Sequence, residues 1–559
     1  MKKLKYIALS LLTLGMVACE NELVQDIRDR NNTGVDDSSL PELTAGTADF
    51  SNYVAVGASF TAGFTDNALF IASQENSFPN IMANMFAKVG GGTFTQPLMN
   101  DNFGGLILGG NPVIDPSTGN RLFSERLVFG GAGPVPLQAL NPSAMSTTDF
   151  ALNNPTGPFN NLGIPGAKSF HLVAPGYGNL SNFPAAANPY AIRVTGNAPN
   201  ASILELAMAQ NPTFFSLSEI GGNDVLGYAT TGGDGSNPIT PTATFDASLN
   251  ALVGGLTANG AKGVIGNLPN ITSLSHFTTV PYNPLDPSNP DFGPLIPTLN
   301  SLFGALNGVY AFLESQGAIN DAAARSIVFT DTAANAIVIH DENLANISTL
   351  ITQTLLANPQ FPAFLAQFGL PAAAAPQVAG LLGIMYGQSR QATENDLFVL
   401  PSSSVIGTVN SDFAAFLESQ GLSAALAAQF ATEGVTLPLE DKWALLPQEQ
   451  EEIAIATEAY NASILAVANA NGLALVDLNS ILEQASSAGI MFDDYNMNTD
   501  LVFGGLVSLD GVHLTARGYA LMANSFLQAI DATYGSNFEA SGNLAKAGDY
   551  QTNYSASLQ

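Results

Sequence analysis

Three short apolar runs, each ending in a turn, constrain the fold of this chain more than any other feature. They are Tyr53–Gly57, Thr213–Ile220 and Leu473–Asp477. Runs that are nearly continuous in apolar residues and bounded by turn-forming ones are typical of strands buried on both faces of a parallel sheet. A helical period between Ile453 and Val467 precedes the third run, as expected where helices connect the strands. The pattern therefore predicts an α/β fold, in which functional side chains lie at the carboxyl ends of strands.

The charge composition excludes several classes of function. Of 559 residues, 16 are Lys or Arg and 46 are Asp or Glu, which gives a formal net charge of −30. So few cations cannot neutralise many phosphates, which argues against nucleic-acid binding and against electrostatic binding to anionic lipid heads. With 46% hydrophobic residues, the chain can bury a large core and is not a disordered acidic tail. The 53 glycines and 32 prolines indicate many loops and turns.

The N-terminus has the pattern of a bacterial lipoprotein signal. Three early lysines are followed by an apolar run over 6–16 and by small residues before Cys19, the only cysteine. The run is shorter than the roughly 17–25 residues of a membrane-spanning helix. We expect residues 1–18 to be removed and Cys19 to be lipidated. An ordinary secretory signal that happens to contain a cysteine is the alternative.

The residues that follow Cys19 predict a tether. The segment 19–50 is dense in charges and poor in large apolar residues, which suits a solvated link between a lipid anchor and a globular body. We therefore expect a membrane-anchored protein of the cell envelope, at the outer membrane or the cell surface.

Ser59 and Asn223 follow the first two apolar runs directly. A strand that ends at Gly57 and then turns would present the Ser59 hydroxyl at the sheet edge, where a nucleophile is useful. Two glycines before Asn223 allow a tight turn, after which its amide offers a donor of the kind that oxyanion holes require. Taken singly, each is also a common turn residue.

Asp510 and His513 complete this pattern near the C-terminus. Of the four histidines, only His513 follows an acidic residue by three positions. An acid at this spacing can accept a hydrogen bond from Nδ1–H and leave Nε2 free to accept a proton. Asp510 could also be the N-cap of the amphipathic helix expected after it, and the two roles are compatible.

Together with the segment 161–167, these residues resemble the four sequence blocks of the GDSL or SGNH hydrolases. The blocks read Gly57-Ala58-Ser59-Phe60, Asn161 to Ala167, Gly221-Gly222-Asn223-Asp224 and Asp510-Gly511-Val512-His513, in the family's chain order. The resemblance implies a three-layer α/β/α sandwich with a parallel sheet, of the SGNH or flavodoxin-like kind. The first block differs from the Gly-Asp-Ser-Leu motif that gives the family its name, because Ala58 stands in place of Asp and Phe60 in place of Leu.

The resemblance also implies a role for each matched residue. Ser59 would be the nucleophile, His513 the general base and then acid, and Asp510 the group that orients His513. The backbone N–H groups of Ser59 and Gly166 and the side-chain amide of Asn223 would form the oxyanion hole. No cofactor is expected.

The remaining histidines are interpreted as structural or surface residues. They are His171, His276 and His340, of which the first two could approach the site. No two histidines are close in the sequence and the one cysteine is assigned to lipidation, so no metal site is expected.

The length of the chain predicts a hydrolase domain with insertions. We expect this domain over 51–535, with partly helical insertions at about 90–160 and 281–448, and a C-terminal tail over 536–559. Within the second insertion, the stretch 344–389 has no charged residue, and its prolines interrupt it too often for a membrane span. It could be a helical cap that receives an acyl chain or membrane lipid over the active site, or a second small core.

A short repeat lies in the same insertion. The heptapeptide Ala311–Gly317 recurs as Ala415–Gly421, with a partial echo that ends at Gly369. A duplicated helical unit would explain it, and so would independent helices that end in the same way.

The sequence thus predicts a lipid-anchored serine hydrolase of carboxylic esters, lipase- or esterase-like, which acts on a small-molecule ester or a lipid. A carbohydrate O-deacetylase is one alternative, against which the single tryptophan argues because sugar sites use aromatic platforms. A non-catalytic binding lipoprotein on the same fold is another, and the complete Ser–His–Asp set argues against it. The sequence does not specify the oligomeric state.

Overall fold

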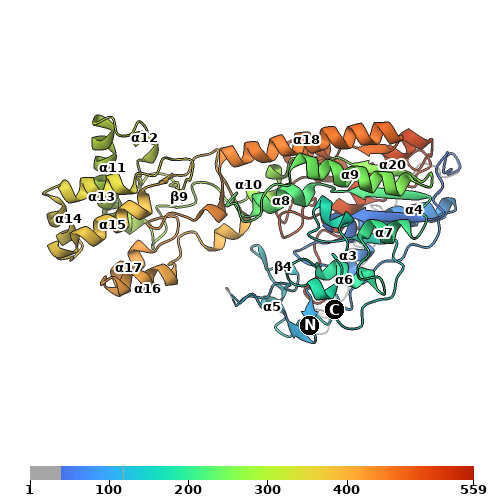
Figure 1. Ribbon diagram of the computed structural model, residues 1–559, viewed down its shortest axis with the longest axis horizontal. Coiled ribbons are helices and arrows are strands. Elements are labelled where there is room, and N and C mark those ends of the chain that lie inside the picture. Colours follow the sequence, from blue (N-terminus) through green and yellow to red (C-terminus); the bar gives the residue numbers. More distant parts are fainter. Residues whose placement is uncertain (1–39, 117–118) are drawn as a thin grey trace, which may run out of the picture.

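The computed structural model describes residues 40–116 and 119–559 (Figure 1). The predicted signal region, Cys19 and the tether up to residue 39 lie outside the described residues. The chain forms two parts along one long axis. We call residues 40–280 and 447–559 the body, and residues 281–446 the second lobe.

The body is built on one five-stranded parallel sheet with the strand order β13-β8-β7-β1-β6. The strands are β1 (Tyr53–Gly57), β6 (Asn161–Gly163), β7 (Phe214–Ser218), β8 (Lys262–Gly266) and β13 (Ala474–Val476). All residues of β1 and β7 are buried, as expected of central strands. The predicted α/β fold with a parallel sheet is confirmed.

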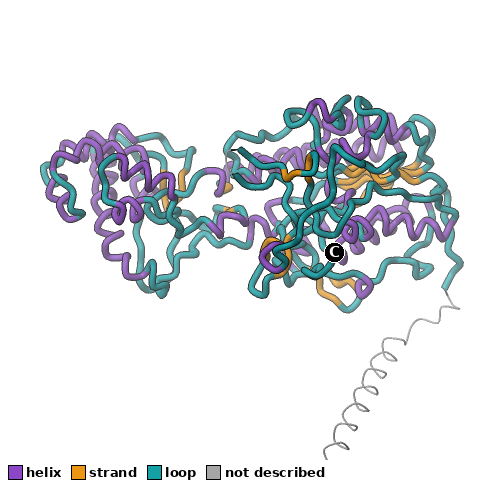
Figure 2. The backbone as a smooth tube through the Cα atoms, turned by 90° about the horizontal axis from the view of Figure 1, so that it is seen from below, coloured by secondary structure: helices purple, strands orange, loops and turns teal. Residues whose placement is uncertain are grey.

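Helices lie on both sides of this sheet, which Figure 2 shows edge-on. Helix α9 packs against α7 and α18, and α4 packs against α20, which also contacts β13. The helices of the body are α2 (Ser59–Ala62), α3 (Ile71–Glu75), α4 (Phe78–Phe86), α5 (Leu137–Leu140), α6 (Pro189–Thr195), α7 (Ile203–Met208), α8 (Gly222–Thr230), α9 (Thr242–Thr257), α10 (Ser275–Thr278), α18 (Pro447–Asn471), α19 (Leu478–Ser487) and α20 (Ala516–Tyr534).

The start of α20 differs from one sequence expectation. Thr515, not Asp510, is the N-cap, because its hydroxyl oxygen accepts a hydrogen bond from the N–H of Gly518 at 3.0 Å. Asp510 lies five residues before the cap, in the loop that precedes the helix, so its carboxylate is available for other partners.

The first insertion is mostly irregular and folds back on the body. It holds two hairpins, β2–β3 (Ile107–Leu108 and Asn111–Pro112) and β4–β5 (Leu127–Phe129 and Pro134–Pro136). The N–H of Leu127 donates to the carbonyl of Asp66 at 2.7 Å, which ties the second hairpin to the loop after α2.

Both ends of the described chain pack on the body. Phe50, in the predicted tether, stacks on Phe86 with ring centroids 3.9 Å apart. In the predicted C-terminal tail, Phe538 and Ala547 are buried in the main core, and Tyr554 packs edge-on against Phe70. Residues 536–559 are therefore part of the body.

The second lobe has a hydrophobic core of its own. Its helices are α11 (Ile296–Ser315), α12 (Ala322–Arg325), α13 (Ser348–Ala357), α14 (Phe361–Gln367), α15 (Ala375–Tyr386), α16 (Ser411–Ser419) and α17 (Ala424–Phe430). Two small antiparallel pairs complete it, β9–β10 (Val338–His340 and Ser389–Gln391) and β11–β12 (Leu397–Phe398 and Ala444–Leu445).

The uncharged stretch 344–389 forms the far end of this lobe. Its helices α13, α14 and α15 lie at the end of the molecule that is remote from the sheet (Figure 1). Ile351, Phe361 and Tyr386 are buried in the lobe's own core. Of the two arrangements that the sequence allows, the stretch therefore forms a second core and does not cover the sheet edge.

No single helix in 40–116 or 119–559 is long and apolar enough to cross a membrane. The segments 361–367 and 372–386 reach the required length and composition only together, with a bend of 113° between them. Phe361, Leu365, Ala379, Leu382 and Tyr386 of these segments are buried in the core of the second lobe.

The repeated heptapeptide corresponds to similar helix endings. Helices α11, α14 and α16 are each followed by a glycine with positive φ, at Gly317, Gly369 and Gly421. The helices have 20, 7 and 9 residues, so the likeness is confined to their C-terminal turns. Independent helix endings explain the repeat better than a duplicated unit.

Candidate active site

Ser59 stands at the carboxyl end of β1, as the first residue of the short helix α2. The turn before it requires Gly57, because a Cβ atom there would lie 2.1 Å from Thr61 Oγ1 and 2.7 Å from the Ser218 carbonyl oxygen. Ser59 is only 5% exposed, and its hydroxyl donates to Glu219 Oε1 at 3.3 Å. The strand, turn and helix expected around a nucleophile are present.

Asp510 and His513 lie in a tight loop that a bridge between Val507 and Leu514 closes. Asp510 Oδ2 is 2.9 Å from His513 Nδ1, and Asp510 Oδ1 accepts hydrogen bonds from the N–H groups of Val512 and His513 at 2.8 Å each. Burial alone would raise the pKa of Asp510, but His513 and these hydrogen bonds hold it well below its usual range. An ionised carboxylate only accepts hydrogen bonds, so Nδ1 carries the hydrogen and Nε2 stays free.

Gly511 also allows this loop to pack closely against helix α10. Gly511 has a φ of +77°, and a Cβ atom there would lie 2.8 Å from the backbone N of His276. The N–H of His276 donates to the Gly511 carbonyl at 2.9 Å, so α10 braces the loop from outside.

Two phenylalanines that follow Ser59 closely in the sequence contact the imidazole of His513. Its ring centroid is 5.7 Å from that of Phe60, the residue after Ser59, and 4.7 Å from that of Phe64. The structure has no hydrogen bond between Ser59 and His513, because the serine hydroxyl is directed to Glu219.

The candidate oxyanion-hole residues follow the strands on either side of β1. Gly166 comes after β6, is exposed and has a φ of +78°. Asn223 lies in the first turn of α8, after β7, and its amide donates to the Ala167 carbonyl at 3.0 Å. The backbone N–H groups of Ser59 and Gly166 have no hydrogen-bond acceptor within the described residues. The predicted donors thus lie on three neighbouring strands of one sheet edge.

Glu219 is the site residue that the sequence interpretation missed. It follows β7 with a φ of +54°, and its Oε2 accepts the N–H of Thr61 at 3.0 Å while its Oε1 accepts the Ser59 hydroxyl. Burial raises the pKa of Glu219 to about 7, although these hydrogen bonds and His513 oppose the shift. The available signal was an acid placed directly between a buried strand and a Gly-Gly turn.

Asp66 is a second buried carboxylate, near the Asp510–His513 pair. Its Oδ1 accepts the N–H of Leu509 at 3.1 Å, and its Oδ2 is buried without a hydrogen-bond partner. Burial raises the pKa of Asp66 to about 7, and the nearby Asp510 adds to the shift. When Asp66 is protonated near neutral pH, Asp510 has no second buried negative charge beside it.

Ser59, Glu219 and Asn223 share the wall of a narrow cavity of about 100 Å³. Nearly all the other wall residues are apolar, and many are leucines from the loop after β8, from α19 and α20 and from the loop before α20, namely Leu268, Leu274, Leu478, Leu482, Leu506 and Leu521. An uncharged apolar group fits beside the serine hydroxyl, whereas an anion would meet the Glu219 carboxyl and no cationic side chain among the lining residues.

The other three histidines, His171, His276 and His340, pack or pair with neighbouring residues of the fold. His171 stacks on Tyr177 with centroids 4.5 Å apart, and its Nδ1 accepts the N–H of Lys168. His340 pairs with Ser389 between β9 and β10. Burial lowers the pKa of His276, whose Nδ1 lies 3.3 Å from the Asp510 carbonyl oxygen. His276 therefore braces the loop that carries Asp510.

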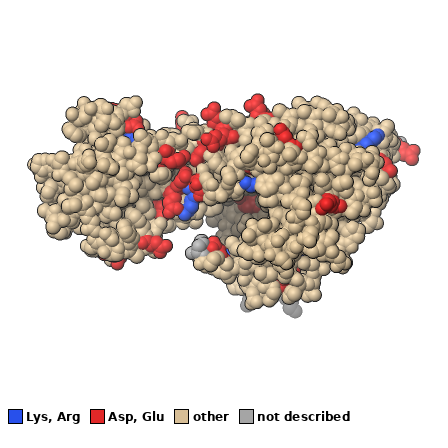
Figure 3. Space-filling model, viewed as in Figure 1, with Lys and Arg blue, Asp and Glu red and all other residues tan. Residues whose placement is uncertain are grey.

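A cluster of acids marks the junction between the body and the second lobe (Figure 3). Oxygen atoms of Glu342, Asp441 and Glu449 lie within 4.8 Å of one another. Burial raises the pKa of Asp441 to about 7 and that of Glu449 to about 9, with the neighbouring Glu342 adding to both shifts. Shared protons therefore hold this cluster together near neutral pH.

Comparisons with known proteins add no relative. No protein-family model matches this chain, and neither a curated protein nor a solved structure is significantly similar to it.

Proposed function

We propose that the protein is a serine hydrolase of carboxylic esters. The observation that carries the proposal is the 2.9 Å contact between Asp510 Oδ2 and His513 Nδ1, in a loop that lies against Phe60 beside Ser59. A buried serine at a strand end, a histidine with a free Nε2 and an anion that orients it are the parts that acyl transfer needs.

In the proposed reaction, the Ser59 hydroxyl turns from Glu219 to Nε2 of His513. It loses its proton to that nitrogen as its oxygen attacks the ester carbonyl carbon. The negative charge that develops on the carbonyl oxygen is stabilised by the N–H groups of Ser59 and Gly166 and by the Asn223 amide. The protonated His513 then gives its proton to the leaving alcohol, and a water molecule repeats the sequence to release the acid.

Glu219 has two consequences for this mechanism. Its hydrogen bond holds the Ser59 hydroxyl in the site, and it competes with His513 for the same proton. Once ionised, its charge favours the positively charged imidazole that forms during attack, since the two groups interact electrostatically. Glu219 is thus proposed as a positioning residue that also tunes the charge of the site.

The narrow cavity beside Ser59 supports an ester with an apolar acyl group. Its mostly apolar, leucine-rich wall has no Lys, Arg or His for an anion and few polar groups for the hydroxyls of a sugar. This favours an esterase or lipase over a carbohydrate O-deacetylase, whose sugar would have to lie elsewhere.

Replacing Ser59 by alanine tests the proposal directly. We expect Ser59→Ala to lower kcat for p-nitrophenyl butyrate by at least about 10⁴-fold and to abolish labelling by a fluorophosphonate probe. Ser51→Ala, an exposed serine before β1, is the matched control and should keep both properties. Unchanged labelling of Ser59→Ala would refute the proposal, and a wild-type protein that shows neither property would instead be a binding protein.

The lipid anchor and the envelope location are part of the same proposal. They rest on the sequence pattern before Cys19, which lies outside the described residues. Cys19→Ala should move the protein from the membrane fraction to the released fraction of the cells that make it. Retention in the membrane fraction would contradict lipidation at Cys19.

A further inference from the structure

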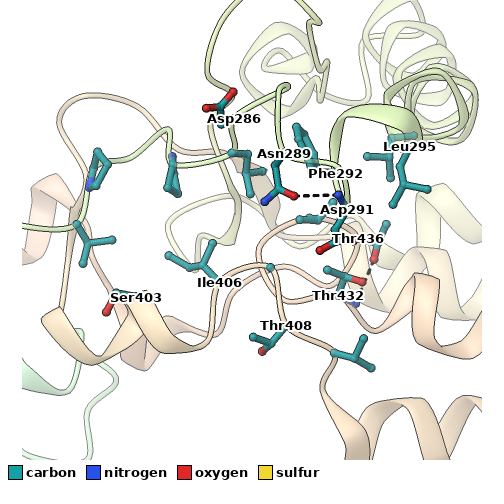
Figure 4. Close-up of a pocket in the computed structure, with 18 of the residues that line it drawn as sticks. Asp286, Asn289, Asp291, Phe292, Leu295, Ser403, Ile406, Thr408, Thr432 and Thr436 are labelled. Atoms are coloured by element: carbon teal, nitrogen blue, oxygen red, sulfur yellow. Dashed lines mark hydrogen bonds between the residues drawn. The ribbon is translucent and has the colours of Figure 1, made fainter. Parts of the chain in front are cut away.

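A cavity with a volume of about 920 Å³ lies between the second lobe and the body (Figure 4). This is at the upper end of the roughly 300–1,000 Å³ of ligand pockets. Three segments of the body form one wall, at Gly133, Val280 and Phe503. The second lobe supplies the rest, including Phe292, Ile406 and Phe430.

Two of the three body segments run from this cavity toward the candidate active site. Thr279, in the wall, is three residues after His276, so their Cα atoms are at most about 11 Å apart. His276 in turn contacts the backbone of Asp510. Phe503 lies three residues before Leu506, which lines the cavity beside Ser59. The second lobe is inserted after the carboxyl end of β8, on the sheet edge that also carries Ser59.

Several polar groups of the wall already have hydrogen-bond partners. The hydroxyls of Ser403, Thr408 and Thr432 donate to the carbonyls of Leu400, Val405 and Ala428 at 2.8, 2.7 and 3.2 Å. The amide oxygen of Asn289 accepts the N–H of Asp291 at 2.9 Å (Figure 4). A ligand in this cavity therefore meets mainly apolar surface.

The charges of the wall exclude anionic ligands. Asp286 and Asp291 are the charged residues among the described lining residues, and no Lys, Arg or His accompanies them. A carboxylate or phosphate would be repelled by the two acids and would find no cation to bind. Phe503, at the cavity, is 81% exposed and contacts Phe129 with centroids 5.9 Å apart, so apolar surface is also offered to solvent there.

We propose that this inter-lobe cavity binds the long apolar chain of a neutral lipid ester. That the ligand is an ester rests on the proposed function, whereas binding of a neutral apolar chain rests on the cavity itself. The cavity beside Ser59, at about 100 Å³, is too narrow for a long chain, and the inter-lobe cavity provides the volume. The free fatty acid released by hydrolysis carries a charge that the two acids disfavour, which promotes its release.

A binding measurement on the full chain with Ser59→Ala separates binding from turnover. The probe is N-phenyl-1-naphthylamine, a neutral dye whose fluorescence rises in apolar surroundings. We expect the dye to bind, and methyl laurate to displace it at much lower concentration than laurate does. Ile406→Trp, which fills the cavity, should weaken dye binding by at least about tenfold. Ile384→Trp, the same change at a 76% exposed position on α15 outside the cavity, should leave it intact.

The outcomes distinguish this proposal from the proposed function. Equal dye affinity in the two tryptophan variants, both with the thermal unfolding temperature of the parent, would overturn the assignment of the cavity. Displacement by laurate as readily as by methyl laurate would overturn the choice of a neutral ligand. Loss of hydrolysis is read separately, from p-nitrophenyl butyrate and the protein with Ser59 intact, and a protein that binds the dye in the cavity without hydrolysing esters refutes only the proposed function.

Discussion

Asp510 is held by four hydrogen-bond donors, and a single oxygen cannot serve them all. Oδ1 accepts the N–H groups of Val512 and His513, and Oδ2 accepts the N–H of Asn67 and pairs with Nδ1 of His513. An asparagine at this position would turn its NH₂ group toward one pair of donors. The loop geometry and the imidazole tautomer therefore depend on a carboxylate.

We predict that Asp510→Asn lowers kcat by about 10⁴-fold, because His513 loses the tautomer with a free Nε2. It should also lower the free energy of unfolding by about 1–3 kcal/mol, since buried donors lose their partner. Ester hydrolysis and chemical denaturation measure the two effects. Asp500→Asn, at an exposed position, is the matched control. Wild-type activity in Asp510→Asn would contradict the role of Asp510 in orienting His513.

Glu219→Gln should flatten the pH dependence of stability. Because burial raises the pKa of Glu219 to about 7, the folded protein retains a proton that the unfolded chain releases near pH 4.5. The unfolding free energy therefore falls as pH rises from about 5 through 7. The glutamine variant should lose less stability over this range, as thermal unfolding at pH 5 and 7.5 would show. Asp66 titrates in the same direction and leaves a residual slope. Identical slopes in the two proteins would contradict this account.

At the residue scale, the sequence predicts most of the candidate site. Ser59, Asn223 and the Asp510–His513 pair could be identified because each occupies a fixed place relative to a strand end or to another site residue. Glu219 could not, since its role depends on the pairing of β1 with β7, which places it opposite the turn of Ser59. A carboxylate after a strand is otherwise an ordinary surface residue.

At the scale of elements, the cap of α20 links helix stability to the site. The Thr515 side chain accepts the N–H of Gly518 at 3.0 Å and donates to the Gly505 carbonyl at 2.6 Å. It is buried and lies two residues after His513, so it joins the helix to the loop that carries Asp510 and His513. Loss of the hydroxyl leaves two buried backbone groups without partners.

Thr515→Ala should therefore cost about 1–2 kcal/mol of unfolding free energy, at the upper end for an N-cap. Denaturant titration gives this value. Ser423→Ala removes the cap of α17 in the second lobe, where the bond to the Leu426 N–H is 3.4 Å and exposed, and should cost less. A larger loss for Ser423→Ala would contradict the argument.

The strands and helices that could be predicted are those with a clear local pattern of apolar residues. The three apolar runs correspond to β1, β7 and β13, and the helical period before the third run lies within α18. The strands β6 and β8 have weaker signals, with three residues in β6 and two glycines in β8, and their places in the sheet come from pairing with distant strands.

At the scale of the whole molecule, the acid cluster makes the junction of body and lobe sensitive to pH. The carboxylates of Glu342, Asp441 and Glu449 face one another there, with Asp234 and Asp341 also near Asp441. Arg390 pairs with Asp341 and Asp396, and Lys442 pairs with Glu440. The central acids are therefore balanced by protons more than by cations.

We predict that stability falls as pH rises through the range 7–9. Raised pKa values mean that the folded state holds protons which the unfolded state has lost, so each ionisation disfavours folding. Glu449→Gln should reduce this loss, as thermal unfolding between pH 6 and 9.5 would show, because glutamine can still accept the N–H of Leu446. Glu458→Gln, exposed on the same helix, should not. A steeper loss in Glu449→Gln would contradict the assignment.

The position of the second lobe could not be obtained from the sequence. Its uncharged stretch faces its own core and lies far from the sheet. Apolar composition indicates that a segment is buried without indicating which surface buries it. The inter-lobe cavity could not be predicted for a similar reason, because its walls come from parts of the chain as distant as Gly133 and Phe503.

The pairing of β13 with β8 has a consequence for how the protein reaches its native state. The two strands lie side by side, with Ala474 opposite Val264, yet the whole second lobe is made between them. During synthesis the edge of β8 stays unpaired until that lobe and α18 have left the ribosome, which exposes it to wrong partners. Contacts over such separations also form slowly. Ser59 is made early and His513 late, so the chain passes through a long stage in which it has folded parts and no complete site.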